Sequence, residues 1–309
     1  MATSGSYDFT LDRDGMVSEA YRLLGGIAIG EDPTTEELTD GGRTLNLMLK
    51  GWQAEGIGLW LERTVTLFLG YEKQSYLLGS TGDNCSTSVV KTEMKVAGVA
   101  TDSTIDVDSI TGITDGDYIG IELDDNTVQW TTINGSPSGD TITLTDILTG
   151  ASAIDNHVYT YTSKIQRPLK VIEARHIAAD GNSIDLLPIS RQEYMNLPDK
   201  TTTGTVNQFF YDAQLDNGVL YLWPTCSNVQ ETVQMTLKYP IMDFDASTDN
   251  GEFPVEWMDA VVLNLAIRIG IKIGVTPDQN LMALAAEAKF HVKSFDVEKT
   301  SMFLQPATR

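Results

Sequence analysis

The chain has 309 residues, of which 41% are hydrophobic and 21% are charged, and it carries a net charge of −22 at pH 7. This composition is typical of a globular protein long enough for two domains, so disorder is not the default expectation. Affinity for the DNA backbone comes from cations that release counterions, and the negative charge therefore argues against a DNA-binding face. The same charge opposes self-association, so we expect a monomer until a partner supplies contact area.

The sequence shows no sign of export or of membrane insertion. It contains no run of 18 apolar residues, and the opening stretch MATSGSYDFTLDRDG lacks the basic and apolar blocks of a signal peptide. We therefore expect a protein that is made in the cytosol and has no membrane partner. Cys85 and Cys226 belong to no Cys-x-x-Cys pair, so free thiols are expected.

Apolar residues recur at helical spacing near both ends of the chain, with stripes such as Val17, Ala20, Tyr21 and Leu24, or Leu281, Leu284, Ala285, Ala288 and Val292. Each end of the chain is expected to form one helical hairpin, too short to be stable alone. Docking the two hairpins together as a four-helix bundle would bury all four stripes. The predicted helices span about residues 14–29, 35–56, 255–273 and 277–294.

A short repeat marks the corner of each predicted hairpin. The stretch IAIGEDP at residues 27–33 returns as IKIGVTP at residues 271–277. In both, the Gly suits the end of a helix and the Pro suits the start of the next one. Two capping boxes are expected at the following helix starts, Thr34 with Glu37 and Thr276 with Gln279.

After Trp60 the sequence changes to short alternating runs, which favour strands. Five such runs, STIDVD, DYIGIEL, TVQWTTI, DTITLTDI and HVYTYT, lie within residues 81–163 and predict an inserted small antiparallel β barrel or sandwich. Residues 80–163 hold thirteen Asp or Glu against two Lys, a net charge of −11, so this stretch is expected to be a unit of its own. Its expected core residues are Trp130, Val128, Ile121 and Ile119.

Beyond the insert, two turn signals predict β hairpins, one at Asp180-Gly181 and one at Asn217-Gly218. Between them, the SRQEYMNLP stretch begins with a capping box and predicts one short helix, and ETVQMTLKYPIMDF predicts a final strand. The expected fold class is therefore α+β. We expect a core domain made of residues 1–80 and 164–309, and an inserted domain made of residues 81–163.

The sequence offers little for catalysis. It has no phosphate-binding Gly-x4-Gly-Lys loop, no His-Glu-x-x-His and no Gly-x-Ser-x-Gly. His157, His176 and His291 stand at no metal-ligand spacing. We therefore assign no catalytic residue, cofactor or metal, and we expect a protein that is not an enzyme.

Three alternatives stay open at this stage. An EF-hand is rejected because Thr111 stands where Gly is needed, but an irregular calcium site could still use Asp106, Asp108, Asp115 and Asp117. A carboxylate pair for glycoside cleavage is also open. Trp52 lies on an apolar helical stripe and is expected in the core, whereas Trp223 could point either way.

Two segments carry a resemblance to a known family. They are the motif Leu45-Asn46-x-Met48-Leu49-x-x-Trp52-x-Ala54-Glu55-Gly56 and the later helix with Leu263-Asn264-Leu265-Ala266-Ile267. In combination they resemble the head-to-tail adaptors, or tail accessory factors, of short-tailed phages. The resemblance covers roughly residues 14–80 and 165–295. Residues 80–163 resemble a small β domain added in larger relatives, with DGDYIGIELDDNTVQWTTI as the clearest piece.

The resemblance implies a structural protein at the head–tail interface of a virion. Members assemble as a ring, typically of twelve copies, beneath the portal protein, and they extend the channel toward a tail or nozzle protein. Double-stranded DNA passes through the lumen, and an acidic wall would let it pass without specific binding. A well-solvated surface is the other interpretation of the acidic residues.

The last predicted helix and the arm that follows it are the candidate docking elements. Apolar side chains persist there after the helical spacing has ended, and monomers seldom leave such residues exposed. We expect contact with the portal or with a neighbouring subunit, unless the arm folds back on its own bundle. A receptor-binding or glycan-binding tail protein and a cell-wall-degrading virion enzyme remain as other functions. The docking residues are Lys289, Phe290, Lys293, Phe295, Phe303 and Leu304.

Overall fold

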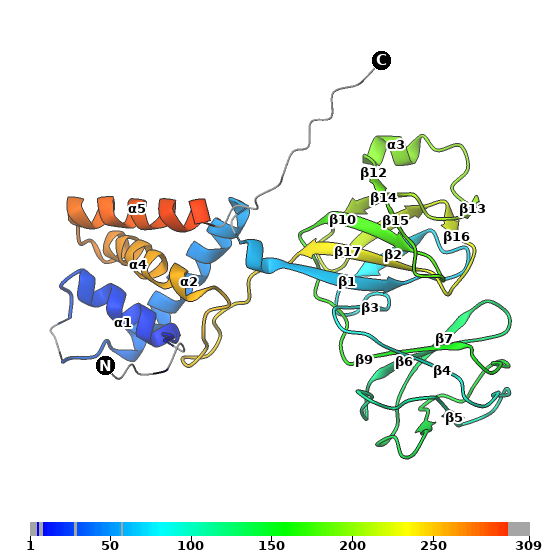
Figure 1. Cartoon of the computed structure of the whole chain (residues 1–309). Coiled ribbons are helices and arrows are strands. Elements are labelled where there is room, and N and C mark those ends of the chain that lie inside the picture. The colour runs from blue at the N-terminus through cyan, green and yellow to red at the C-terminus, as the bar shows by residue number, and fades with distance from the viewer. Residues whose placement is uncertain (1–4, 6–8, 28–29, 57, 296–309) are drawn as a thin grey trace. The chain divides into compact units, whose positions relative to one another are not determined.

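The structure is a computed structural model that describes residues 5, 9–27, 30–56 and 58–295 (Figure 1). The chain forms two compact units, a helical unit of Met1–Leu61 with Pro240–Arg309 and a β unit of Glu62–Tyr239. The fold is mixed α+β, as the sequence predicts. The unit boundaries differ from those expected for the core domain, because residues 62–80 and 164–239 belong to the β unit.

Four long helices build the helical unit, at positions close to those predicted. Two short 3-10 turns, η1 and η2, precede β1 and α4. The first helix begins after Asp12, whose side chain accepts a hydrogen bond from the Gly15 amide at 2.7 Å. The second begins with the predicted Thr34–Glu37 capping box, which is confirmed. The elements are α1 (Arg13–Leu23), α2 (Thr35–Ala54), η1 (Leu59–Leu61), η2 (Val255–Trp257), α4 (Met258–Ile273) and α5 (Gln279–Phe295).

The two corner repeats behave differently. Gly274 takes a left-handed conformation with φ of 76° and caps α4, as predicted. The first helix ends at Leu23 rather than near residue 29, because the earlier Gly25, with φ of 69°, already breaks it. The predicted Thr276–Gln279 capping box is also wrong. Since α5 begins at Gln279, Thr276 lies two residues before the N-cap position.

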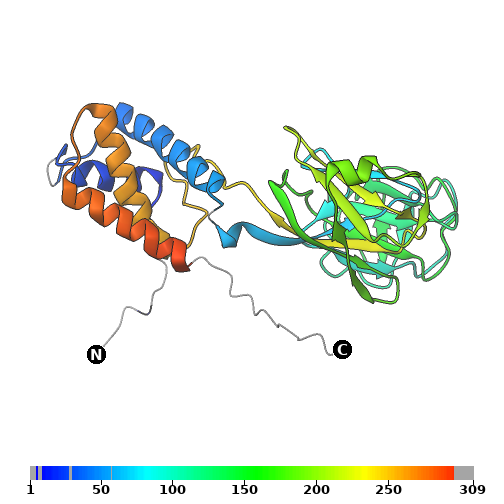
Figure 2. The same ribbon diagram turned by 90° about the horizontal axis from the view of Figure 1, so that it is seen from above.

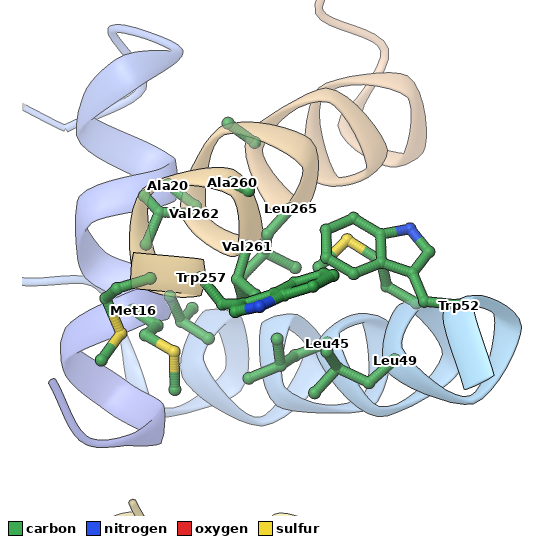
Figure 3. Packing of buried hydrophobic residues seen from close by; sticks show 14 of the residues in the cluster. Met16, Ala20, Leu45, Leu49, Trp52, Trp257, Ala260, Val261, Val262 and Leu265 are labelled. Carbon is green, nitrogen blue, oxygen red and sulfur yellow. The ribbon is translucent and has the colours of Figure 1, made fainter. Parts of the chain in front are cut away.

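The four long helices share one hydrophobic cluster, and α4 contacts α1, α2 and α5. Figure 3 shows Trp52 and Trp257 beside each other in this cluster, with ring centroids 5.9 Å apart. Trp52 is buried, as its helical stripe predicts. The α1–α2 contact depends on Gly41, because a Cβ atom there would lie 2.4 Å from Val17 Cγ1. This close approach left no sign in the hydrophobic pattern.

Residues 241–252 reach η2 along α2, held by side chains that bind their backbone. Lys50 Nζ donates to the Ile241 carbonyl at 2.5 Å. Trp60 Nε1 donates to the Glu252 carbonyl at 2.7 Å. These polar contacts satisfy a segment that has no regular secondary structure.

The β unit contains a five-stranded and a four-stranded sheet that share one hydrophobic cluster. Both predicted hairpins are confirmed, since β10 pairs with β11 and β14 with β15, each antiparallel. The short predicted helix, α3 (Arg191–Met195), starts with the expected Ser190–Glu193 capping box. One sheet has the order β11 (Ser183–Asp185), β10 (Lys170–Ile177), β17 (Thr232–Lys238), β1 (Glu62–Phe68), β3 (Cys85–Ser86). The other has the order β12 (Leu187–Pro188), β14 (Gln208–Asp212), β15 (Gly218–Trp223), β2 (Ser75–Leu78), and a further pair joins β13 (Thr203–Gly204) to β16 (Thr225–Cys226).

Residues 90–161 form a separate four-stranded sheet within the β unit, called here the small sheet after the small insert predicted there, with a hydrophobic cluster of its own. All five predicted strands of this region are present. In the part of the chain that the structure describes, they form an open sheet and a two-stranded ribbon rather than a closed barrel. The sheet has the order β4 (Val90–Glu93), β9 (His157–Tyr161), β6 (Tyr118–Glu122), β7 (Val128–Thr132), and the ribbon pairs β5 (Thr104–Asp106) with β8 (Thr141–Thr143).

The predicted core of the small sheet is correct for two of its four residues. Ile119 and Ile121 are fully buried. Val128 is only half-buried, and Trp130 leaves this core to pack on Phe68 of β1, with ring centroids 4.9 Å apart. Trp130 pairs with Gly120, between the two isoleucines, so its side chain lies on the opposite face of the sheet.

Two sets of contacts fix the small sheet to the rest of the β unit. Phe68 packs against Tyr159 and Tyr161 of β9 in a buried aromatic cluster. At the turn between β6 and β7, Asn126 Nδ2 donates to the Ser227 carbonyl at 3.0 Å, and Asn126 Oδ1 accepts from the Val229 amide at 3.3 Å. The small sheet is therefore a packed part of its unit.

Candidate docking surface

The last helix, α5, is held to the helical unit by one narrow stripe. Ala285 and Val292 are its buried residues, and Asn264 of α4 donates a hydrogen bond to the Ala285 carbonyl at 3.0 Å. Figure 1 shows α5 as the outermost helix beside α4. The buried stripe at i and i+7 leaves most of the circumference of α5 without a covering element.

Large apolar side chains occupy this uncovered side. Phe290 is 69% exposed and Leu284 is 51% exposed, and Met282 is exposed as well. The sequence placed Leu284 in the buried stripe, and the structure shows this to be wrong. Leu284 lies one residue before Ala285, about 100° around the helix, and the buried stripe is centred on Ala285 and Val292, which leaves Leu284 outside it. Met282, Phe290 and Lys293 lie within about 80° of one another around the helix and are called here the outer face of α5, whereas Leu284 is exposed on the other side of the buried stripe.

Lys289 has a different environment from the one expected for a docking residue. Its Nζ lies 2.9 Å from Glu55 Oε1 and 4.9 Å from the centroid of the Trp52 ring. An ammonium over an indole face is attracted by the ring quadrupole, and the carboxylate adds a charge-assisted hydrogen bond. Lys289 therefore ties α5 to α2 within the chain.

The other predicted docking residues fall into two groups. Phe290 and Lys293 are exposed on α5, and the Phe290 ring lies edge-on to His291 at 6.1 Å. Phe295 is the last residue of the helix. Phe303 and Leu304 lie outside the described residues. The structure thus brings Phe290 and Lys293 together on one surface.

A second exposed apolar group at the end of α4 was missed by the sequence analysis. Ile271, Ile273 and Val275 are exposed, around the Gly274 cap. The repeated Ile-x-Ile-Gly pattern was interpreted only as a helix end. Its alternating isoleucines within a helix were the available signal, because residues two apart on a helix cannot both face the same core.

The described residues include two open, mainly polar hollows, one of about 210 Å³ beside Met94, Asp102 and Asp106 and one of about 200 Å³ beside Thr64, Glu173 and Arg175. The cavity between α2, α4 and Trp60 measures about 20 Å³, which is room for about one water, and it is lined mainly by apolar side chains such as Trp52, Trp257 and Phe253. Across residues 5, 9–27, 30–56 and 58–295, no group of three or more His, Cys, Asp or Glu side chains is placed to hold a metal ion. No helix in these ranges is both long and apolar enough to span a bilayer.

Three of the four aspartates of the open calcium alternative bind separate groups of the chain. Asp106 Oδ1 accepts from Thr141 Oγ1 at 2.6 Å, Asp115 Oδ1 accepts from the Gly135 amide at 2.7 Å, and Asp117 Oδ2 accepts from the Thr114 amide at 2.7 Å. Each carboxylate therefore already stabilises local backbone or side-chain structure.

The two cysteines are buried free thiols. Burial raises the pKa of the Cys85 thiol well above its ordinary value, and it raises the pKa of Cys226 to about 11. Thiolate is the reactive form, so neither side chain is suited to nucleophilic chemistry. Trp223, whose direction the sequence left open, is half-buried and donates from Nε1 to the Asp199 carbonyl at 2.9 Å.

Comparison with known proteins leaves the family undetermined. No protein-family model and no curated protein matches the chain. Among solved structures, the chain is similar to the Gp54 tailspike of Acinetobacter baumannii bacteriophage AP22, a structure in complex with A. baumannii capsular saccharide. The identity is 15% and the TM-score is 0.23, over 26% of this chain and 16% of the tailspike chain. A likeness of that extent carries no conclusion about fold or function.

Proposed function

We propose that the protein is a structural head-to-tail adaptor of a virion. In this proposal it assembles as a ring beneath a portal protein, extends the channel for double-stranded DNA and provides the attachment surface for a tail or nozzle protein. The long helices act as a four-helix bundle, and the ring has about as many copies as the resemblance implies, typically twelve. The role is structural, with no catalytic residue, cofactor or metal.

The outer face of α5 is the observation that carries the proposal. Large apolar side chains on an outermost helix are costly to leave in water, at roughly 25 cal/mol per Å² of apolar surface. A partner that covered Met282 and Phe290 would recover that free energy. Lys293 beside them supplies a cation in a chain whose net charge is −22, so the face also suits a partner with exposed carboxylates.

The charge of the chain supports the same role. Copies with a net charge of −22 repel one another over about a Debye length, roughly 8 Å at physiological salt. A portal ring that holds each copy by the outer face of α5 would offset this repulsion. An acidic channel wall would in turn repel DNA phosphates, so that DNA passes without binding.

Cosedimentation with the portal rings of the same phage tests the proposal. We expect the full chain to pellet with the rings, and we expect the Phe290→Ser, Lys293→Glu double variant to remain in the supernatant. Leu215→Ser is the matched control, because Leu215 is 87% exposed in the turn between β14 and β15 of the other unit. Equal pelleting of the double variant and the control would contradict docking through α5.

Three further measurements address the remaining alternatives. Light scattering of the free chain should give a monomer, and a stable ring without portal would contradict templated assembly. Deletion of residues 296–309 should abolish stacking on portal rings, and unchanged cosedimentation would contradict docking through the arm. A peptidoglycan release assay should show no turnover, and release of fragments would favour a wall-degrading enzyme instead.

A further inference from the structure

The sheets of the β unit have two kinds of edge strand, those whose backbone groups are bonded by loops of the chain and one whose outward backbone groups are open. An edge strand exposes unpaired backbone groups, and natural proteins usually cover or block them. At β2, Asp83 Oδ2 accepts from the Leu77 amide at 2.8 Å, and the Asp83 amide donates to the Leu77 carbonyl at 2.7 Å. At β7, the Gln129 side chain bonds the Ile147 carbonyl and the Thr149 amide. Both edges are thus covered by their own loops.

The other edges of the five-stranded sheet and of the two four-stranded sheets follow the same rule, with one exception. At β4, the Asp108 amide donates to the Glu93 carbonyl, and at β3 the Ile165 amide donates to the Cys85 carbonyl. The exception is the segment from β11 to β12, residues 183–188, which forms the edge of the five-stranded sheet and then the edge of the sheet that contains β14 and β15. Among the described residues, no strand lies on the outer side of this segment.

The register shows which backbone groups β11 offers. The Ala178 amide donates to the Asn182 carbonyl, and the Leu186 amide donates to the Ala174 carbonyl. In an antiparallel pair the inward-bonding residues alternate, so residue 184 also bonds inward. The backbone amides and carbonyls of Ser183 and Asp185 are therefore directed away from β10. They provide two donors and two acceptors for one more strand.

The side chains along this edge are apolar where a partner would cover them. Ile184 is 51% exposed and Leu187 is 59% exposed. Ile184 pairs with His176, and His176 pairs with Val233, a residue of the buried cluster. Ile184 therefore lies on the same face of its sheet as the buried hydrophobic cluster. It extends that apolar face to the edge strand, where the side chain is exposed to solvent. Pro188 has no amide to donate, which leaves β11 as the strand that can be extended.

We propose that β11 pairs with an extended segment from a second copy of this chain, namely the arm of residues 296–309. This inference rests on the proposed function only in requiring neighbouring copies. The arm has fourteen residues after α5 and reaches about 46 Å when extended, enough to cross to an adjacent molecule. In a strand, Thr300, Met302 and Leu304 share one face, which would lie against Ile184, and Pro306 ends the strand.

Binding of a labelled peptide of residues 296–309 to the full-length chain tests the edge itself. Asp185→Pro removes one outward amide while leaving the inward bonds to β10 in place. We expect it to weaken peptide binding about tenfold, equivalent to about 1.4 kcal/mol. Asp185→Asn is the matched control, because it also loses the ion pair with Arg175 at 2.6 Å but keeps the amide, and it should bind within about twofold.

Several results of this experiment would overturn the proposal. They are absence of peptide binding, equal binding by Asp185→Pro and Asp185→Asn, and equal binding of a peptide with Met302→Asp and Leu304→Asp. Thermal unfolding of both Asp185 variants shows whether each is folded. If Asp185→Pro is unfolded, Ser183→Pro, compared with Ser183→Ala, replaces it in the same measurement.

Disulfide crosslinking distinguishes a second copy from the chain's own arm. Full-length chains carrying Ile184→Cys are mixed with chains carrying Met302→Cys or Leu304→Cys, under mild oxidation at high protein concentration. We expect crosslinked pairs that contain one of each variant, and none when Leu215→Cys replaces Ile184→Cys. A crosslink that forms only within a chain carrying both cysteines would overturn the proposal. Portal binding of the Phe290→Ser, Lys293→Glu variant, measured separately, reports on docking through α5 and does not depend on the β11 edge.

Discussion

Asn46 binds the backbone of Phe244 through both ends of its side-chain amide. Its Nδ2 donates to the Phe244 carbonyl at 3.2 Å, and its Oδ1 accepts from the Phe244 amide at 3.0 Å. The Asn46 side chain thus satisfies both backbone groups of Phe244, as a paired residue of a neighbouring β-strand would. Asn46 lies on α2, so this pair joins the first helical hairpin to the segment that leads into the second.

Removing this pair should destabilise the helical unit. Asn46→Ala leaves a partly buried amide and carbonyl without their partner, which costs about 1–3 kcal/mol in the free energy of unfolding. Urea denaturation measures the change. The control is Leu47→Ala at the next, exposed position, which should stay within about 0.5 kcal/mol of the parent. A loss no larger than that of the control would show that the Asn46 pair does not stabilise the unit.

The contact between α1 and α2 predicts opposite effects for two glycines of the same helix. Gly41→Ala would place its Cβ 2.4 Å from Val17 Cγ1 and should cost about 1–3 kcal/mol through overpacking. At Gly51 the nearest atom is Arg268 Nη2 at 3.8 Å, so Gly51→Ala should stabilise by up to about 1 kcal/mol through helix propensity. Adding Val17→Ala to Gly41→Ala should recover part of the loss. Similar melting temperatures for the two glycine variants would contradict the close approach.

The side chain of Asn126 is expected to hold the small sheet to the segment of Ser227 and Val229. Its backbone has a positive φ, which asparagine accepts more readily than most residues. Its φ of 62° is left-handed, where glycine is unstrained and alanine costs about 1–2 kcal/mol. Asn126→Gly therefore isolates the loss of the hydrogen bonds to Ser227 and Val229. Asn126→Ala adds the strain and should be less stable than Asn126→Gly by about 1 kcal/mol.

Hydrogen exchange of the β6 and β7 amides measures both variants of Asn126. We expect faster exchange in Asn126→Gly than in the parent, and faster still in Asn126→Ala. Asn134→Gly, at a turn after β7, serves as a comparison. Unchanged exchange in Asn126→Gly would mean that the aromatic cluster around Phe68 alone holds the sheet.

His157 predicts a decline of stability in mild acid. Burial is the largest cause that lowers the pKa of His157 below its ordinary value of 6.5, and Lys91 adds to it. Glu122 and Glu93, with oxygens 3.6 Å from the ring nitrogens, oppose the shift without reversing it. A histidine whose pKa is lower in the folded protein favours the fold while it is neutral. This contribution is complete above pH 6.5 and is lost as the pH falls through the folded pKa.

Urea denaturation at a series of pH values checks this sign. The free energy of unfolding should fall below pH 6.5 in the parent, and His157→Gln should remove that part of the pH dependence. His291→Gln is the control, since His291 is exposed on α5. An identical pH profile for the parent and His157→Gln would contradict the role assigned to burial.

The sequence predicted those elements whose signals are local. The strand runs between residues 103 and 162, the Asp180-Gly181 turn and the Ser190–Glu193 capping box depend on near neighbours, and each was found. The end of α1 was missed because the earlier Gly25 competes with Gly30, and both have positive φ. One glycine with positive φ is enough to end a helix, so α1 ends before Gly25, the first such glycine along the chain.

The predictions that were wrong concern which neighbouring element a residue packs against. Leu284 and Trp130 belong to correctly predicted elements, but their faces were assigned to the wrong neighbours. The open edge at β11 depends on how two sheets are ordered, which no local pattern contains. For the docking surface, the sequence identified α5 as the helix of interest. Only the structure separates Lys289, bound to Glu55, from the exposed Phe290.

The helical unit draws its hydrophobic cluster from both ends of the polypeptide, and this has a consequence for biosynthesis. When Leu45 and Met48 leave the ribosome, the residues that will cover them, such as Val261 and Leu265, have not been made. The nascent chain must therefore carry an exposed apolar hairpin while the whole β unit is translated. A message truncated before α4 would yield a product that cannot bury this hairpin, and such a product is a natural substrate for chaperones and proteases.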